Sequence, residues 1–189
     1  PQMRSVYLGM SVKGGWIFDT KNKSGAAHFM EHILFQGTPS FPDVEIFSDF
    51  IEGLAGSYNA ATHLQTIKFH INVPSRYFKE ALKIGGEVFY EPLFAPGSVE
   101  KERNVILSEI SERQDNLWYK NSRFFAQNRY KKGHPMLLDG GGSIESVKSL
   151  QKDDLTDYWS KFFHPKNTYL VLIGDIGKNS KSVIEEVLG

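Results

Sequence analysis

The sequence contains no cysteine, and this absence limits the metal chemistry open to the protein. A disulfide framework is excluded, and so is a metal site built from thiolates. Any transition metal that the chain binds must therefore be held by histidine and carboxylate side chains.

The sequence also lacks an excess of charge of either sign and a long apolar run. Lysine plus arginine number 22, as do aspartate plus glutamate, so neither nucleic acid nor an anionic membrane surface is an expected partner. No apolar run reaches the roughly 18 to 20 residues that cross a bilayer, and no secretory signal is present. These absences predict a soluble, cytoplasmic protein without a membrane span. Because the chain starts at Pro1, a trimmed N-terminus leaves the mitochondrial matrix and the periplasm open.

The length of 189 residues is typical of one domain with one substantial core. We therefore predict a single domain over residues 1–189. Near residues 174–178 the last predicted strand ends and a new helix begins. An alternative division is therefore a core domain of residues 1–176. Residues 177–189 would then begin a linker or helix that leads to a further domain.

Hydrophobic patterning predicts strands separated by runs of helices. Alternation predicts strands over residues 6–12, 67–73 and 169–173, and a first hairpin that returns through residues 16–18 after Gly14-Gly15. Periodicity and capping signals predict helices over residues 25–36 with Ser24 as N-cap, from Asp43 to 54, and over 75–90, 98–113, 117–130 and 153–163. This order is typical of an α+β fold, a two-layer sandwich of a mostly antiparallel sheet packed by helices.

Two aromatic clusters accompany the later helices. They are predicted to be core residues, with a position lining the cleft as the alternative for some of them: Trp118, Phe124 and Phe125 in one, and Tyr158, Trp159, Phe162 and Phe163 in the other. The Lys131-Lys132 pair is predicted to lie in a solvated loop.

His28, Glu31 and His32 lie within the first predicted helix. At 3.6 residues per turn, the two histidines project from the same face, one turn apart. Two such imidazoles can hold one cation while the neighbouring carboxylate reaches a water in the open coordination position. The alternative is a helix with two surface histidines and a solvated glutamate.

A catalytic zinc site typically has three protein ligands and one exchangeable water, so a third ligand is needed. Two carboxylates fall on the apolar arc of the predicted helix after Ser98, which consists of Val99, Glu102, Val105, Ile106, Glu109 and Ile110. A buried ionised carboxylate is unfavourable unless it is paired or binds a metal. The alternative is that one or both carboxylates lie at the edge of the arc and reach solvent.

The segment from Gly25 to Thr38 resembles the signature of the inverzincin metallopeptidases, the family of pitrilysin, insulin-degrading enzyme and mitochondrial processing peptidase. In that family a distal glutamate, about 76 residues beyond the second histidine, completes the zinc site. Here 109 − 32 − 1 = 76 residues lie between His32 and Glu109. The resemblance therefore implies a zinc ion bound by His28, His32 and Glu109, with Glu31 as the base that activates water. It also implies that Glu102 supports the site by orienting a histidine.

The resemblance covers essentially the whole chain. Residues 55–62 are similar to a family segment that binds the substrate backbone, which implies substrate contacts for Asn59 and Ala60; Ala55 stands where the family has glycine. Family members pair this domain with a second, similar one in the same chain or in another subunit. That partner contributes an arginine and a tyrosine. The resemblance thus implies a homologous second domain or subunit, and a dimer is one form that this pairing takes.

Together, the motif and the resemblance predict a zinc metalloendopeptidase that hydrolyses peptides or unfolded protein segments and forms the catalytic half of a larger assembly. Two alternatives stay open. One is a non-catalytic assembly subunit that retains the fold and a zinc site. The other is a structural zinc site, in which Glu102 would be the fourth ligand.

Overall fold

The structure is a computed structural model and describes residues 4–189. Its strands are β1 (Ser5–Val12), β2 (Ser57–Thr62), β3 (Ile67–Pro74) and β4 (Thr168–Gly174). Its α-helices are α1 (Ala26–Ile33), α2 (Val44–Gly53), α3 (Phe78–Tyr90), α4 (Ser98–Asp115), α5 (Leu117–Arg129), α6 (Ile144–Ser149), α7 (Lys152–Phe162) and α8 (Ser180–Leu188). None of these helices is long and apolar enough to cross a membrane.

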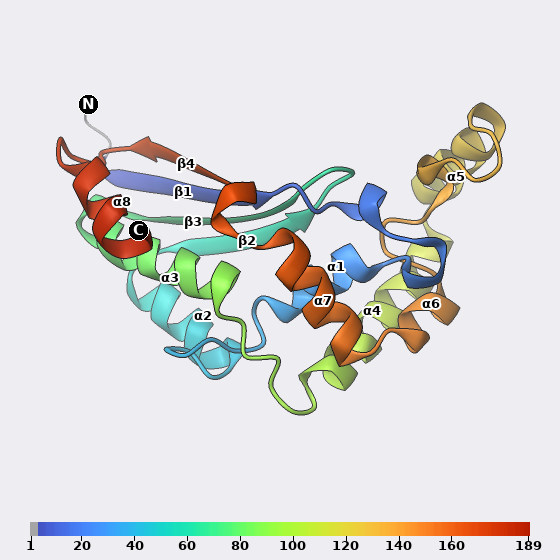
Figure 1. The fold of residues 1–189 in the computed structure, drawn as a ribbon, viewed down its shortest axis with the longest axis horizontal. Coiled ribbons are helices and arrows are strands. Elements are labelled where there is room, and N and C mark those ends of the chain that lie inside the picture. Colours follow the sequence, from blue (N-terminus) through green and yellow to red (C-terminus); the bar gives the residue numbers. More distant parts are fainter. Residues whose placement is uncertain (1–3) are drawn as a thin grey trace.

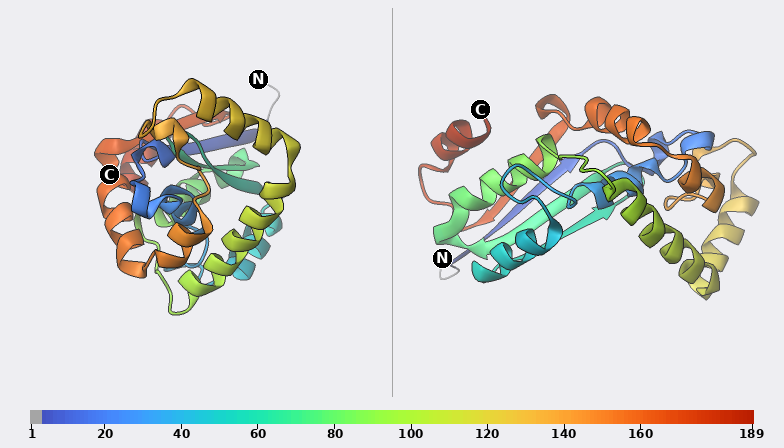
Figure 2. Two further views of the ribbon diagram at one scale, coloured as in Figure 1. Left: turned by 90° about the vertical axis from the view of Figure 1, so that its right-hand side faces the viewer. Right: turned by 90° about the horizontal axis from the view of Figure 1, so that it is seen from below.

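The strands form one antiparallel sheet in the order β2-β3-β1-β4. Helices α1, α2 and α3 contact strands of this sheet, and Figure 1 shows the sheet as one layer with these helices beneath it. The right-hand view of Figure 2 shows α8 and the N-terminus at one end of the molecule, and α4 and α5 at the other. The predicted α+β architecture, a two-layer sandwich with an antiparallel sheet, is confirmed.

The core forms where the central strands face the helices. Val6, Leu8, Met10 and Val12 of β1 are buried, and so are alternate residues of β3 from Ile67 to Val73. The register places Leu8 opposite Ile71 and Met10 opposite Phe69, so the apolar side chains of the two strands lie on one face. In α3, Gly85 permits close approach to this face, since a Cβ there would lie 2.8 Å from the Met10 Sδ.

The predicted hairpin at the start of the chain is wrong. Residues Trp16–Phe18 form a 3₁₀ turn, and β1 pairs with β3 and β4. The backbone N–H groups of Trp16 and Ile17 donate instead to His63 and Leu64, in the turn between β2 and β3. Pairing with strands distant in sequence has replaced the local hairpin.

Strand β2 was not among the predicted elements. Its sequence, Ser-Tyr-Asn-Ala-Ala-Thr, is rich in residues that are depleted in strands. It is extended because Ser57 to Thr62 pair with Asn72 to Ile67 of β3. The tertiary pairing therefore overrides a weak local preference.

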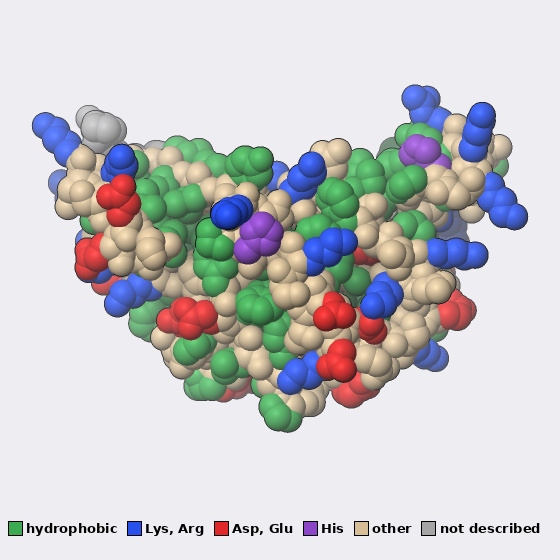
Figure 3. Space-filling view, in the orientation of Figure 1, with side chains coloured by type: hydrophobic (Ala, Val, Ile, Leu, Met, Phe, Trp, Pro, Cys, Tyr) green, Lys and Arg blue, Asp and Glu red, His purple; other side chains and the backbone are tan. Residues whose placement is uncertain are grey.

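The prediction of core positions for the aromatic residues of α5 is wrong. Trp118 is 83% exposed, and Phe124 and Phe125 are 66% and 60% exposed, because α5 turns only Ala126 fully inward. Lys and Arg side chains gather at the end of the molecule where α5 lies, as Figure 3 shows. The second aromatic cluster does lie in or against the core, with Tyr158, Phe162 and Phe163 buried and Trp159 packed against them.

Helix α8 packs on α3 rather than standing apart from the fold. Val183, Ile184, Val187 and Leu188 are partly buried against the core. The division of the chain into residues 1–176 and 177–189, like the single-domain interpretation, stays a prediction.

Candidate metal centre

Helix α1 begins differently from the prediction. Gly25, with φ of +91°, occupies the N-cap position expected for Ser24. The cap is supplied from outside the helix, because the Asp19 carboxylate accepts hydrogen bonds from the N–H groups of Gly25 at 2.7 Å and Ala27 at 3.2 Å. Asp19 is buried, and this burial raises its pKa to about 7 despite the N–H donors. The carboxylate fixes the first turn of α1 immediately before His28.

The two predicted carboxylates of α4, Glu102 and Glu109, differ from each other in burial. Glu102 is buried together with Val99, Ile106 and Ile110, whereas Val105 is 41% exposed and does not belong to the buried face. The Glu109 side chain is 40% exposed and lies at the edge of that face. One carboxylate is therefore enclosed, and the other opens toward solvent.

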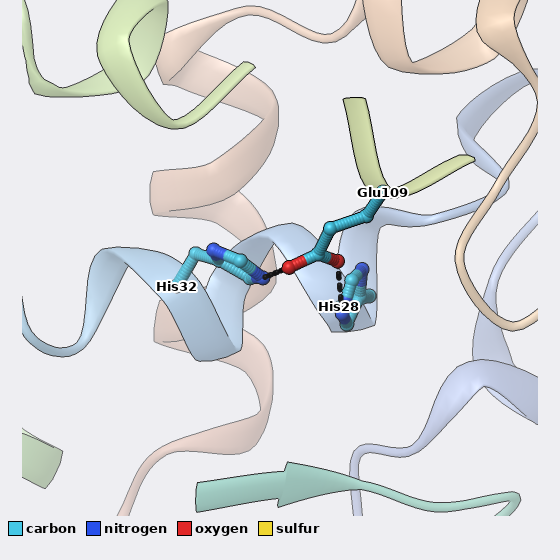
Figure 4. Close-up of side chains that lie close together, drawn as sticks. All are labelled: His28, His32 and Glu109. Carbon is cyan, nitrogen blue, oxygen red and sulfur yellow. Dashed lines mark ion pairs between the residues drawn. The ribbon is translucent and has the colours of Figure 1, made fainter. Parts of the chain in front are cut away.

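The structure brings His28, His32 and Glu109 together between α1 and α4. One ligand-type atom from each residue lies within 4.8 Å of the others, and this is the one such group of histidine and acidic side chains found in residues 4–189. The two oxygens of Glu109 point to different histidines: Oε2 lies 3.6 Å from the His28 Nε2, and Oε1 lies 3.7 Å from the His32 Nε2. Figure 4 shows the carboxylate between the two rings.

These spacings suit a shared zinc ion. They are too long for direct hydrogen bonds between nitrogen and oxygen. Ligand atoms about 2.1 Å from a tetrahedral ion lie about 3.4 Å from one another. Two imidazole nitrogens and one carboxylate form the type of donor set that leaves a fourth position open.

Glu102 holds His32 from the side away from Glu109. Its Oε2 lies 2.9 Å from the His32 Nδ1, so the Nε2 of the same ring faces the shared position. Burial disfavours the charged form of His32, but the hydrogen bond that its Nδ1 donates to Glu102 and the charges of Glu109, Glu102 and Glu31 outweigh it and raise the pKa of His32. Glu102 thus has the geometry of a residue that orients a ligand histidine.

His28 is held in its neutral form. Burial, followed by the neighbouring His32 and the charge of Arg113, lowers its pKa to about 3. Among the described side chains, the Nδ1 of His28 is buried without a hydrogen-bond partner. A neutral imidazole is the form that binds a metal.

Glu31 lies on the same helix and is half-buried. Its Oε2 accepts a hydrogen bond of 2.5 Å from the hydroxyl of Thr62, at the end of β2. The same hydroxyl lies 3.4 Å from the backbone oxygen of Ala27. Thr62 therefore ties Glu31 to the edge strand and restricts where its carboxylate can point.

Asn59 and Ala60, the predicted substrate-binding residues, lie on β2. This strand is at one edge of the sheet and contacts α1. The Asn59 side chain is exposed and accepts a hydrogen bond from the N–H of Ala60. An edge strand beside the candidate metal centre offers unpaired backbone groups to an extended peptide.

Sequence reasoning did not assign roles to several residues that shape this site. Thr62 and Arg113 contact or influence the motif residues from positions distant in the sequence, and Asp19 caps α1 from a position just before the helix. A polar residue such as Asp19 before a helix is a weak capping signal, and here the cap is six residues removed from Gly25. Thr62 lies within the segment 55–62 that resembles a family segment, but that resemblance does not link it to Glu31, and no local signal identifies Arg113.

Comparison with known proteins adds independent information. The family model described as "Insulinase (Peptidase family M16)" matches residues 1–134. An uncharacterized zinc protease from Rickettsia bellii is 29% identical over 93% of this chain and 42% of its own length. The insulin-degrading enzyme of Drosophila melanogaster is 31% identical over 93% of this chain and 18% of its own length. The chain therefore spans less than half the length of these relatives.

Solved structures share the fold. A protease from Helicobacter pylori superposes with a TM-score of 0.89 at 21% identity, over 97% of this chain and 44% of that one. The inactive domain of an M16 peptidase from Pseudomonas fluorescens superposes equally well, with a TM-score of 0.88 at 20% identity, over 98% of this chain and 45% of that one. At these identities the likeness shows the fold alone. The match of the family model over most of the sequence goes further, and it places this chain in the insulinase family of peptidases, M16.

Proposed function

We propose that this chain is the zinc-binding, catalytic half of a metalloendopeptidase that hydrolyses peptides or unfolded protein segments. The observation that carries the proposal is the convergence of His28, His32 and Glu109 at spacings that suit one ion, with the Glu31 carboxylate on the same helix. Relatives described as zinc proteases support the choice of metal.

Each residue of the site then has a defined task. His28, His32 and Glu109 would hold the zinc, and Glu102 would keep the His32 ring oriented. Bound zinc would lower the pKa of a water molecule and polarise the scissile carbonyl group. Glu31 would accept the proton of the attacking water and deliver it to the leaving nitrogen. Thr62 would hold the Glu31 carboxylate in position through its hydroxyl.

Substrate would bind in an extended form along β2. Backbone hydrogen bonds to an edge strand give affinity with little demand on sequence, which suits unfolded segments. Asn59 is exposed on this strand and would anchor the peptide backbone next to Ala60.

A complete active site would require a second, homologous domain or subunit. The relatives are more than twice as long as this chain, as expected if a further domain completes the enzyme. The resemblance to the family implies that this partner supplies an arginine and a tyrosine that contact the substrate.

The substitution Glu31→Gln tests the proposal in the intact native polypeptide with any subunit that copurifies. Hydrolysis of a fluorogenic peptide should fall by at least about 10²-fold because the general base is lost. Zinc content, measured by mass spectrometry, should stay at the wild-type level because Glu31 is not a ligand. Glu80→Gln, an exposed position on α3, should change neither quantity. Full activity of Glu31→Gln would contradict the proposal.

A non-catalytic assembly subunit is the second candidate function, because a domain described as an inactive M16 domain has the same fold. In that case the wild-type protein would bind zinc but hydrolyse no peptide, and Glu31→Gln would change nothing measurable.

A structural zinc site is less well supported. Glu102, the candidate fourth ligand, is hydrogen-bonded to the Nδ1 of His32 and stands on the far side of that ring from Glu109. The arrangement therefore favours three protein ligands and an open position.

A further inference from the structure

Arg113 lies one helical turn after Glu109 on α4. A glutamate followed four positions later by a cation has a favourable spacing for an ion pair on a helix. In the part of the chain that the structure describes, however, Arg113 does not pair with Glu109. Its Nη1 lies instead 3.5 Å from the Oδ1 of Asp139, in the loop after α5. Asp139, and not Glu109, is therefore the counter-ion of Arg113.

The Asp139 carboxylate is itself held firmly. Its Oδ1 accepts the backbone N–H of Gly141 at 3.0 Å, and its Oδ2 accepts the hydroxyl of Tyr119. Only 20% of its side chain is exposed. The Arg113 guanidinium lies so close to Gly141 that a Cβ there would be 2.1 Å from its Nη1, so glycine leaves the space that the guanidinium occupies.

The same loop also contacts the start of α1. The hydroxyl of Ser24 donates to the backbone oxygen of Asp139 at 3.1 Å. A Cβ on Gly25 would lie 2.8 Å from the Cα of Gly142, so the backbones of these two segments are in close contact. His28 follows three residues after Gly25. The loop thus contacts both ligand-bearing helices within about one turn of a ligand.

We propose that Asp139 is a positioning residue for the metal centre. Asp139 binds Arg113 and thereby leaves the Glu109 carboxylate free for the ion. This inference rests on the proposed metal site. Without Asp139, the guanidinium would turn to Glu109, its neighbour on α4, and compete with the metal for that ligand. Arg113 is close enough to do so, because it lies four positions after Glu109 on the same helix, and its guanidinium already pairs with Asp139 at 3.5 Å.

Zinc affinity tests this inference without relying on activity. It is measured at neutral pH by competition with a chromophoric chelator, on the intact polypeptide carrying Asp139→Ala, Arg113→Met, or both. Asp139→Ala should weaken zinc binding by about tenfold, the scale seen when outer residues of a metal site are removed. The double variant should bind zinc within about twofold of Arg113→Met alone, because the competing guanidinium is gone.

The matched control is Asp154→Ala. Asp154 also pairs with a cation, Lys23 at 2.6 Å, and its side chain is 23% exposed, but among residues 4–189 its carboxylate bonds to Lys23 and to the N–H of Gln151, and to no group on α4. This variant should bind zinc like the wild type. Asp139→Asn serves if the alanine variant does not fold, since it keeps the acceptor for Gly141 and loses the charge, and it should weaken binding in the same direction.

Three results would overturn the inference. Wild-type affinity in Asp139→Ala or Asp139→Asn would show that the counter-ion is dispensable. A double variant as weak as Asp139→Ala would show that the loss comes from a loosened loop and not from competition by Arg113. Failure of the wild-type chain to bind zinc would refute the proposed metal site as well, and so separates the two proposals.

Discussion

At the scale of single residues, the site depends on groups that control the direction of a side chain rather than on the motif alone. Thr62 binds the carboxylate of Glu31, and Glu102 binds the ring of His32. Both partners come from elements distant in the sequence from α1. The motif supplies the reactive groups, and these partners determine where they point.

Removal of the Thr62 hydroxyl should impair catalysis without loss of metal. Thr62→Val keeps the shape of the side chain but leaves Glu31 without its hydrogen bond. We expect kcat to fall by about tenfold to a hundredfold because the base is misplaced, with zinc content unchanged. Thr62→Ser should recover most of the rate, since it retains the hydroxyl. Equal rates for the valine and serine variants would show that the hydrogen bond has no catalytic role.

Asp19 should make stability depend on pH in the opposite sense to a paired surface carboxylate. Burial raises its pKa to about 7 in the folded chain, above the value of about 3.9 in an unfolded one. The folded state therefore binds the proton of the Asp19 carboxyl group more tightly than the unfolded state does. The stabilisation that this proton gives to the fold is fully present below about pH 4 and is lost as pH rises through about 7.

Urea unfolding of the metal-free protein at several pH values measures this effect. The free energy of unfolding of the wild type, relative to that of Asp19→Asn, should decline between about pH 5 and 7, by at most about 1.4 kcal/mol per pH unit. Parallel pH profiles for the two proteins would contradict the assignment.

At the scale of secondary structure, α4 is fixed by a buried cation that sequence patterning did not single out. Arg103 is buried and donates to the backbone oxygens of Val147 and Leu150, while Glu100 pairs with its outer edge. Its guanidinium also lies over the ring of Phe29 in α1. Arg103 thus connects the two helices that carry the candidate metal ligands to α6.

Substitution of Arg103 should destabilise the whole domain. Arg103→Met leaves two buried carbonyl groups without their donors, which should lower the free energy of unfolding by about 2 to 4 kcal/mol. Lys101→Met, at an exposed position on the same helix, should change it by less than about 0.5 kcal/mol. Denaturant unfolding of both variants measures the difference, and similar values for the two would refute the anchoring role.

At the scale of the whole molecule, the candidate metal centre lies on a hydrophobic core whose contacts do not involve the candidate ligands. Helix α1 buries Ala27, Phe29, Met30 and Ile33 in this core, and α4 buries Ile106 beside them. These contacts hold the helices whether or not an ion is bound. The fold should therefore form without the metal.

Removal of zinc by a chelator should abolish hydrolysis and preserve the fold. Far-ultraviolet circular dichroism should keep its helical signal, while Tm should fall by about 5 to 10 °C from the level seen with zinc at a hundredfold excess over Kd. Unfolding on chelation at room temperature would favour a structural zinc site instead.

The helices and strands with strong periodicity, and with them the α+β class, could be predicted from the amino-acid sequence, and the family resemblance added the candidate ligands. The strands from residue 67 and residue 169, and the helix that carries the three motif residues, lie within a few positions of their predicted bounds. Hydrophobic patterning predicts these elements correctly because each buries one face, and the spacing of the apolar residues indicates that face.

Which elements contact one another became clear only from the three-dimensional fold. In the fold, residues 57–62 form a strand at the edge of the sheet beside α1, and Trp118, Phe124 and Phe125 of α5 are exposed. Arg113 pairs with Asp139, which lies 139 − 113 = 26 positions later in the sequence, and not with Glu109 on its own helix. Such contacts depend on long-range packing and strand pairing, which the local preference of a segment does not encode.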